Sequence, residues 1–281
     1  VPGQNNPFYC AMVEQMDYCA GKLFDYLAVT DDPRWPGHKL IENTYVIFTS
    51  DNGGMEGTPD EVITDNYPLD KGKISLMEGG TRVPLIIVGP DIPAGVDSGV
   101  MVNGLDFYPT ILSLTGSEKP AGKTFDGLDL SKLLKKDPAD SSLVREADGR
   151  VRDTMIWHFP NSSALESTIR VGDYKLVRNY GHLPGSGEPY LELYRLYDTS
   201  SGKPVRVDIE EAHNLAEQDL ERAGELNRRL TEILSRIKAS YPYWNPLHSR
   251  PLPHKDKVPT MVSCNQEGGN VVFEYQEHGA K

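Results

Sequence analysis

Cysteine is scarce in this sequence: the 281 residues include three, so widely spaced that they define neither a zinc site nor a disulfide framework. Long apolar runs are also lacking, and none approaches the roughly 20 residues that a membrane-spanning helix needs. Positive charge is in deficit, and a formal net charge of −12 disfavours nucleic acids and anionic membrane surfaces as partners. These absences indicate a globular protein that binds neither nucleic acid nor membrane, and they leave its compartment open.

The segment from Thr44 to Pro84 is the most informative part of the chain. An apolar, β-branched run from Tyr45 to Phe48 predicts a strand, and the sequence SDNGG follows it almost at once. In α/β proteins, ligands bind outside the carboxyl ends of strands. Asp51 and Asn52 therefore offer side-chain oxygens of the kind that Ca²⁺ or Mg²⁺ prefers, at a position suited to a ligand site.

Lys73 lies further along the same segment and carries a point charge suited to an anionic oxygen. A cation site and a lysine near one strand end indicate an anionic substrate. The plainer alternative is also open at this point. Asp-Asn-Gly-Gly is an ordinary turn composition, and Lys73 could be a solvated surface lysine.

The sequence TSDNGG followed by PLDKGKISLMEGGTRVP resembles the C-terminal signature region of the type I sulfatases, in the alkaline phosphatase superfamily. The resemblance implies that Asp51 and Asn52 are calcium ligands. It also implies that Lys73 contacts the sulfate group of the substrate and assists departure of the leaving group. Glu78 and the glycines after it match a segment that shapes the backbone behind the site. Ile74 departs from the family, because a small residue usually follows the lysine, and this puts local packing in doubt.

Type I sulfatases use a formylglycine made from Cys or Ser in the motif C/S-x-P/A-x-R, and Cys10, Cys19 and Cys264 all lack this context. The resemblance therefore implies that the formylglycine and further acidic calcium ligands lie upstream of this sequence. We expect the chain to be the C-terminal part of a longer enzyme and inactive without the missing N-terminal part of the fold. Cys10 and Cys19 fall on one helical stretch, where we expect them to be buried.

Residues 1–150 are predicted to form the C-terminal part of an α/β catalytic domain. Apolar spacing predicts a helix from Tyr9 to Leu27, a short buried strand from Leu85 to Val88 and a helix from Asn103 to Leu114. The polar stretch from about Lys119 to Arg152 reads as loop and marks a domain boundary. The fold class expected here is α/β, with part of an alkaline-phosphatase-like mixed sheet flanked by helices.

Residues 151–281 are predicted to form a smaller subdomain. The runs MIWHFP, STIRVGDYKLVRNY and YLELYRLYD alternate like strands, and Glu210 to Ile237 has the spacing of a long helix. An antiparallel sheet packed by one helix would bury both. A further strand pattern runs from Val271 to Tyr275. The order of these elements resembles the C-terminal subdomain of many bacterial sulfatases.

His158 is the candidate substrate-binding residue of the second part. The resemblance places the histidine of the WHxP pattern where the subdomain meets the active-site mouth, within reach of the non-sulfate part of the substrate. A histidine flanked by Trp157 and Phe159 is otherwise more often a satisfied core or interface residue, and both alternatives stay open here.

The function implied is a sulfuric ester hydrolase that uses Ca²⁺, with Mg²⁺ as the alternative cation, on a sulfated small molecule or glycan. A cation and Lys73 would have to override the overall negative charge locally. Two alternatives remain: a phosphodiesterase or phosphonate monoester hydrolase of the same superfamily, and a non-catalytic remnant that binds sulfated glycans. The family resemblance favours a periplasmic or secreted location.

Overall fold

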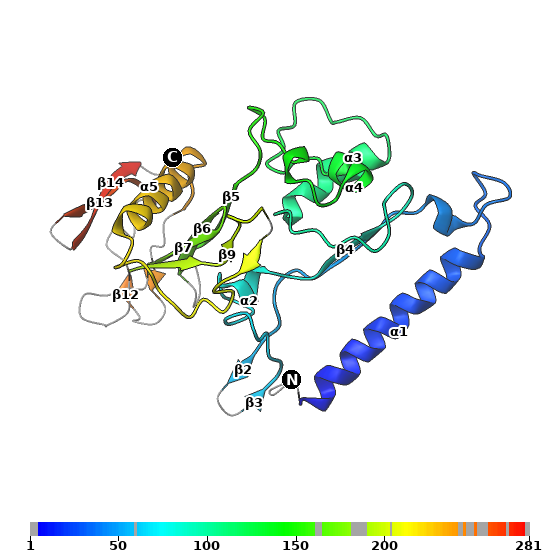
Figure 1. Cartoon of the computed structure of the whole chain (residues 1–281), viewed down its shortest axis with the longest axis horizontal. Coiled ribbons are helices and arrows are strands. Elements are labelled where there is room, and N and C mark those ends of the chain that lie inside the picture. The colour runs from blue at the N-terminus through cyan, green and yellow to red at the C-terminus, as the bar shows by residue number, and fades with distance from the viewer. Residues whose placement is uncertain are drawn as a thin grey trace. The chain divides into compact units, whose positions relative to one another are not determined.

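The structure is a computed structural model that describes residues 5–58, 61–160, 165–180, 190–202, 204–240, 244–245, 250–251, 258–267 and 270–278. The chain forms two compact units, each discontinuous in sequence (Figure 1). The helical unit comprises residues 7–50 and 84–153, and the sheet unit comprises residues 1–6, 51–83 and 154–281. The division into domains at about residue 150 stays a prediction.

The helical unit contains a two-stranded antiparallel sheet of β1 (Val46–Thr49) and β4 (Leu85–Val88), preceded by α1 (Pro7–Val29) and the 3₁₀ helix η1 (Leu40–Asn43). β4 has the predicted bounds, and β1 lies one residue later than the predicted run from Tyr45 to Phe48. The expectation that the second strand is buried was wrong for part of it, because Ile86 is 57% and Val88 42% exposed. Successive side chains of a strand point to opposite faces, and the described residues cover only one of the two faces of β4.

The core of the helical unit lies among its later elements: η2 (Gly104–Asp106), α3 (Phe107–Leu114), α4 (Ser131–Lys136) and η3 (Ser141–Leu143). The predicted helix entry is confirmed, since the side chain of Asn103 accepts a hydrogen bond from the Leu105 amide. α4 lies in the stretch expected to be loop, and it forms because Leu133 and Leu134 bury themselves in the core. A buried bidentate ion pair joins Arg152 to Asp106 at 2.6 and 2.8 Å.

α1 confirms the predicted helix but contains no buried residue. Its apolar positions stay open to solvent, with Phe8 81% and Met12 63% exposed. The expected burial of Cys10 and Cys19 was wrong, because both are exposed. The spacing of apolar residues defined an apolar face, but no element in the described part of the chain covers it.

The sheet unit is built on four antiparallel strands in sequence order: β5 (Thr154–Phe159), β6 (Glu166–Val171), β7 (Tyr174–Asn179) and β8 (Leu191–Arg195). This confirms the predicted antiparallel sheet. The turn between β6 and β7 contains Gly172 with a φ of +54°, a left-handed conformation that glycine adopts without steric cost.

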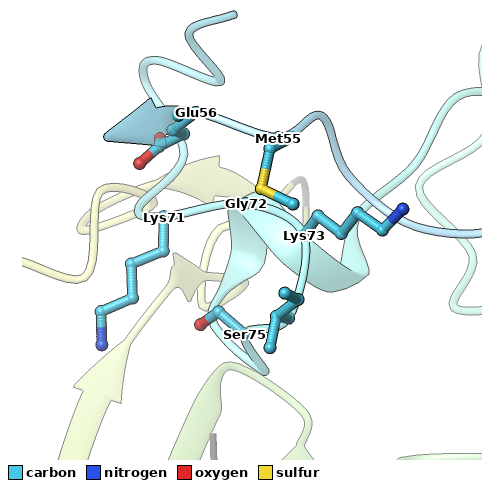
Figure 2. Close-up of a pocket in the computed structure, with 8 residues that line it drawn as sticks. Met55, Glu56, Lys71, Gly72, Lys73 and Ser75 are labelled. Carbon is cyan, nitrogen blue, oxygen red and sulfur yellow. The ribbon is translucent and has the colours of Figure 1, made fainter. Parts of the chain in front are cut away.

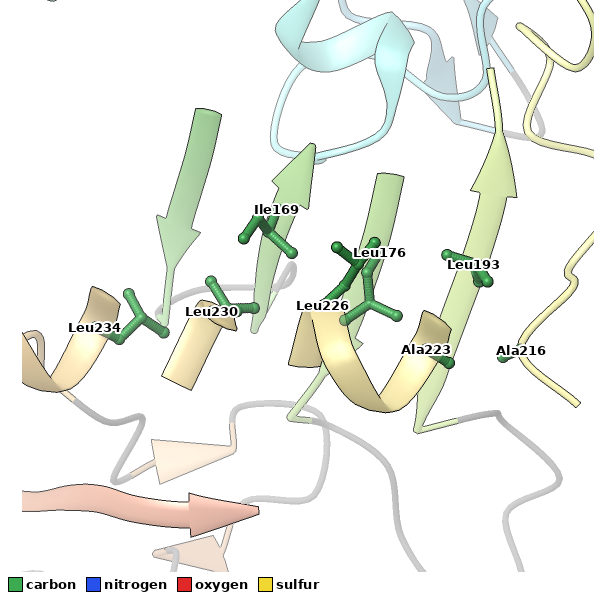
Figure 3. Close-up of a cluster of buried hydrophobic side chains, with 8 residues drawn as sticks. All are labelled: Ile169, Leu176, Leu193, Ala216, Ala223, Leu226, Leu230 and Leu234. Atoms are coloured by element: carbon green, nitrogen blue, oxygen red, sulfur yellow. The ribbon is translucent and has the colours of Figure 1, made fainter. Parts of the chain in front are cut away.

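The two faces of this sheet pack against different parts of the chain. On one face lies α5 (Leu220–Arg236), whose buried leucines meet Ile169, Leu176 and Leu193 (Figure 3). On the other face, Met77 of the segment 51–83 packs with Val177. The segment that contains Lys73 is thus mounted on the sheet opposite the long helix.

α5 begins ten residues later than the predicted start at Glu210. The side chain of Asp219 accepts a hydrogen bond from the Arg222 amide at 3.1 Å and caps the helix there. Upstream, the side chain of Asn214 accepts hydrogen bonds from the amides of Leu193 at 3.0 Å and Ala216 at 2.9 Å. These side-chain contacts hold the preceding residues as turns, although Leu215 continues the apolar spacing.

The other elements of the sheet unit are short or paired locally. They are α2 (Glu78–Thr81) and the antiparallel pairs β2 (Gly57–Thr58) with β3 (Glu61–Val62), β9 (Tyr197–Asp198) with β10 (Val205–Arg206), β11 (Trp244–Asn245) with β12 (Arg250–Pro251), and β13 (Val258–Glu267) with β14 (Asn270–His278). β14 contains the strand expected near the end of the sequence. None of the helices in the described residues combines the length and apolar content that a membrane crossing requires.

Replacing Leu230 by Ala should lower the free energy of unfolding by about 2–5 kcal/mol, because this side chain is fully buried between α5 and the sheet and its removal leaves a cavity. Leu220→Ala is the matched control on the same helix, since Leu220 is 55% exposed. Urea denaturation of both variants checks this. Equal losses of stability would contradict the packing described for α5.

Candidate active site

The backbone joins the residues after β1 to the segment that carries Lys73. The Lys73 amide donates a hydrogen bond to the Gly54 carbonyl at 3.0 Å, and the Gly53 amide donates to the Gly80 carbonyl at 3.0 Å. Two stretches recognised separately in the sequence therefore lie side by side. Asp51 and Asn52 are exposed and partly buried respectively, immediately before this junction.

Asn66 fastens the same junction, and sequence reasoning missed it. Its side-chain oxygen accepts from the Gly54 amide at 3.1 Å, while its side-chain nitrogen donates to the carbonyls of Gly54 at 2.9 Å and Lys71 at 3.0 Å. One amide side chain thus satisfies three backbone groups that belong to no regular element. An Asn before Tyr-Pro is a weak turn signal, and its hydrogen-bond partners cannot be predicted from the sequence.

Close backbone packing explains why this region is rich in glycine. A Cβ at Gly53 would lie 1.6 Å from the Gly79 carbonyl oxygen, and one at Gly72 would lie 2.1 Å from that of Gly54. Any larger residue at either position would force the backbone apart. The glycines of DNGG, GK and EGG are therefore needed for packing the loop.

Lys73 lines a shallow pocket of about 280 Å³ together with Met55, Glu56, Gly57, Lys71, Gly72, Ile74 and Ser75 (Figure 2). Figure 2 shows the side chains of Lys71 and Lys73 extending in different directions from the loop. Both lysines are exposed. The pocket therefore presents positive charge to solvent in a chain whose overall charge is negative.

Asp51 and Asn52 supply two oxygen ligands from consecutive residues. The backbone amide of Asn52 donates a hydrogen bond to an Asp51 carboxylate oxygen at 3.0 Å. Their chemistry fits a hard cation, which takes six to eight oxygen ligands when it is Ca²⁺. In the part of the chain that the structure describes, no group of three or more His, Cys, Asp or Glu side chains could hold a metal ion. The pair is therefore an incomplete ligand set.

Ile74 adopts a φ of +75°, in the left-handed region that β-branched residues rarely enter. This is the position where the family pattern has a small residue. The departure noted in the sequence thus coincides with backbone strain, and the side chain is 42% exposed. A neighbouring residue in the loop, Lys71, also has a positive φ of 55°.

Glu78 begins α2 and lies in a buried cluster of charges. Its carboxylate is 2.6 Å from Arg82 and 3.1 Å from Lys175. Lys175 is 2.7 Å from Glu211, which also accepts the Glu78 amide hydrogen bond at 2.6 Å. Burial alone would raise the pKa of Glu78, but Lys175, Arg82 and Arg170 outweigh it and hold that pKa below its ordinary value. Glu78 is thus ionised and structural, as the resemblance implied.

His158 has protein partners at both ring nitrogens. Nε2 lies 2.7 Å from the Ser240 carbonyl and Nδ1 lies 2.6 Å from the Ser167 hydroxyl. Nε2–H must donate to the carbonyl, so in the neutral ring Nδ1 accepts from Ser167, which lies 2.9 Å from the Tyr180 hydroxyl. These contacts join β5 to the residues after α5. A substrate contact for His158 stays a prediction. It would require one of these two hydrogen bonds to break.

The fold and this loop first define a class. The structure of Ps i-CgsB has a TM-score of 0.50 and 23% identity, covering 73% of this chain and 39% of that one. Its complex with k-i-k-neocarrahexaose has a TM-score of 0.51 and 22% identity, covering 74% and 40%. These similarities show the fold, a mixed α/β structure of the alkaline phosphatase type.

The sequence comparisons then give the family. The family model described as Sulfatase matches residues 4–117. A sulfatase of Formosa agariphila is 31% identical over 276 residues, which cover 93% of this chain and 46% of that protein. Arylsulfatase K of Xenopus laevis is 28% identical over 236 residues, covering 83% and 38%. The chain therefore belongs to the sulfatase family, and it spans less than half the length of these relatives.

The stability of the protein should rise with pH up to about 6.5, in part because of His158. Burial lowers the pKa of His158 below its ordinary 6.5, the Ser240 bond opposes this, and the charge of Arg178 adds to it. The unfolded chain therefore binds more protons than the folded one between the lowered pKa and 6.5, so this stabilisation is lost as pH falls through that window.

Chemical denaturation at pH 5 and pH 7 checks this. His158→Gln should flatten the dependence of unfolding free energy on pH, while His213→Gln, whose side chain is 81% exposed, should leave it as in the wild type. An unchanged slope in His158→Gln would show that His158 is not buried in its neutral form.

Proposed function

We propose that this chain carries part of the active site of a sulfuric ester hydrolase. The observation that carries the proposal is the hydrogen bond from the Lys73 amide to the Gly54 carbonyl, which ties the lysine to the segment that begins with Asp51 and Asn52. Membership of the sulfatase family supports the assignment. A cationic side chain whose backbone is bonded to the segment with oxygen ligands for a metal suits an anionic ester.

Lys73 would act on the leaving group. Its ammonium is exposed at the pocket and has the charge to neutralise the ester oxygen as the sulfur–oxygen bond breaks. Preorganised donors aimed at developing charge are worth about 3 kcal/mol each when one is removed. The Gly54 and Asn66 contacts fix the backbone from which the lysine extends, so its point of attachment is set before the substrate arrives.

Asp51 and Asn52 would hold Ca²⁺, with Mg²⁺ as the other hard cation that these oxygens suit. When bound, the cation supplies Lewis acidity and the formylglycine of the family supplies the nucleophile. The other ligands and that nucleophile must come from beyond the described residues, since none of the three cysteines has the sequence context of a formylglycine. The role of this chain is to position the acid-amide pair and the lysine.

The substrate class we infer is a sulfated glycan or an aryl sulfate. Relatives carry both kinds of name, including N-acetylgalactosamine-6-sulfatase of Sus scrofa, 34% identical over 138 residues that cover 49% of this chain and 24% of that protein, and arylsulfatase K. A structure of similar fold was solved with k-i-k-neocarrahexaose. The phosphodiesterase and phosphonate alternatives are not favoured, because these relatives are sulfatases.

We also infer that a further α/β segment packs on the helical unit. The open apolar face of α1 and the exposed side of β4 are surfaces of the kind that a folded domain normally covers. The shorter length of the chain relative to its relatives agrees with this. A glycan-binding remnant is the other possibility, and retention of Asp51, Asn52 and Lys73 together argues against it.

Lys73→Ala should reduce the kcat of sulfate-ester hydrolysis by about a hundredfold or more in the protein with its complete site, because charge on the departing oxygen would be unopposed. The fold should be retained, since the Lys73 side chain is exposed. Lys123→Ala removes an exposed lysine of the helical unit and serves as the control. A kcat near that of the wild type would remove Lys73 from the mechanism.

Ca²⁺ should raise the melting temperature of the protein with its complete site, and Asp51→Ala should abolish that rise. A ligand present at 100 times its Kd stabilises the folded state by about 2.7 kcal/mol, so the effect is measurable by scanning calorimetry. Asp97→Ala, at an exposed acid of the helical unit, should keep the full shift. If Asp51→Ala retains it too, Asp51 is not a calcium ligand.

A further inference from the structure

We propose that Lys175 and Glu211 are positioning residues for Lys73. They act through the backbone of the loop that contains Lys73 and ends at Glu78. Lys175 belongs to β7 and Glu211 to the turns before α5, and neither has a role in the function proposed above. Both side chains are fully buried, with Lys175 Nζ 2.7 Å from a Glu211 oxygen and 3.1 Å from Glu78. The part of this inference that concerns catalysis rests on the proposed function.

The backbone conformation of the loop around Lys73 requires stabilising contacts from outside the loop. Lys71 and Ile74 both have positive φ angles, 55° and 75°, which cost free energy in residues other than glycine. Among the described residues the Lys73 ammonium has no ion pair, and its side chain is exposed. The backbone therefore sets only the point from which this flexible side chain extends, and that point depends on whatever fixes the residues on either side.

Contacts with the sheet fix the residues just after the strained turn. The Glu78 amide donates to a Glu211 carboxylate oxygen at 2.6 Å, and the Leu76 amide lies 3.4 Å from a Glu166 oxygen of β6. The Gly79 amide closes the loop by donating to the Asp70 carbonyl at 2.8 Å. Acidic side chains from the sheet unit thus hold the two residues at the C-terminal end of the loop.

The cluster holds charges of both signs, and Arg170 adds to the positive field at Glu78. Glu78 and Glu211 supply two negative charges, and Lys175 and Arg82 supply two positive ones, at distances of 2.6 to 3.1 Å. Burial raises the pKa of Glu211, and the charge of Lys175 and the Glu78 amide oppose that shift. Without Lys175, Glu211 would lose its charged partner while Glu78 would keep Arg82, so Glu211 would take up a proton or move toward water. Either change weakens the hydrogen bond from the Glu78 amide to the Glu211 carboxylate.

Amide hydrogen exchange on the full chain tests this by separating a local effect from general destabilisation. The measured quantity is the exchange rate of the Lys73 and Glu78 amides relative to those of Ile169 and Leu176, which lie in the middle of the sheet. Lys175→Met should raise this ratio at least tenfold. Glu211→Gln, which keeps an oxygen acceptor but loses the charge, should raise it less, and it decides the matter if Lys175→Met does not fold.

Arg152→Met is the matched control, because it breaks a buried ion pair in the other unit. It should leave the ratio unchanged. The proposal is overturned if the ratio stays at its wild-type value in both variants, or if Arg152→Met raises it equally, since either result would mean that the cluster serves overall stability alone.

A second measurement addresses the site itself. Inorganic sulfate is titrated into the protein with its complete site and followed by the NMR shift of the Lys73 amide, with Lys73→Ala as the negative control. Weaker sulfate binding in Lys175→Met, by threefold or more, supports the proposal. Unchanged binding alongside faster loop exchange overturns it for Lys73. If sulfate fails to bind the wild type, the proposed function loses its support here, while the exchange ratio still decides whether the cluster positions the loop.

Discussion

The buried charges of Glu78, Lys175 and Glu211 are the constraint on which the sheet unit depends. Carboxylates removed from water are tolerated only with partners, so none of the three could be lost alone without exposing or neutralising the others. Because Glu78 belongs to the segment 51–83, the cluster joins that segment to the sheet by charge. The same face also has apolar contact between Met77 and Val177, and α5 packs on the opposite face through its leucines.

The regular elements could be predicted from the sequence because local spacing determines them. β1, β4, α1 and the four-stranded sheet lie where apolar periodicity indicated. The start of α5 was missed because apolar residues continue upstream, and the cap at Asp219 overrides them. The burial of Cys10 was wrong for another reason: burial depends on what packs against a face, which the face itself does not encode.

The sequence motif of the candidate site was predictable, and the residues that hold the motif in place were not. Asp51 and Lys73 stand in recognisable sequences, whereas Lys175 follows a tyrosine in an alternating strand and looks like a solvated residue. Its partner Glu78 is 97 residues away in the chain, so no local pattern could reveal the pair. Asn66 escaped notice for the same reason, since its value lies in satisfying backbone groups of Gly54 and Lys71 that only the folded loop brings together.

The two-stranded sheet of β1 and β4 has a consequence for how the chain behaves in solution. Within the described residues each strand pairs with the other alone, so both outer edges present unpaired backbone donors and acceptors. Such edges are templates for strands of neighbouring molecules, and Phe48 and Ile86 offer them apolar contacts. Mutual repulsion from the net charge of −12 opposes this association, and salt screens that repulsion over a Debye length of about 10 Å at 0.1 M. Ionic strength therefore sets the balance between a dispersed chain and a self-associated one.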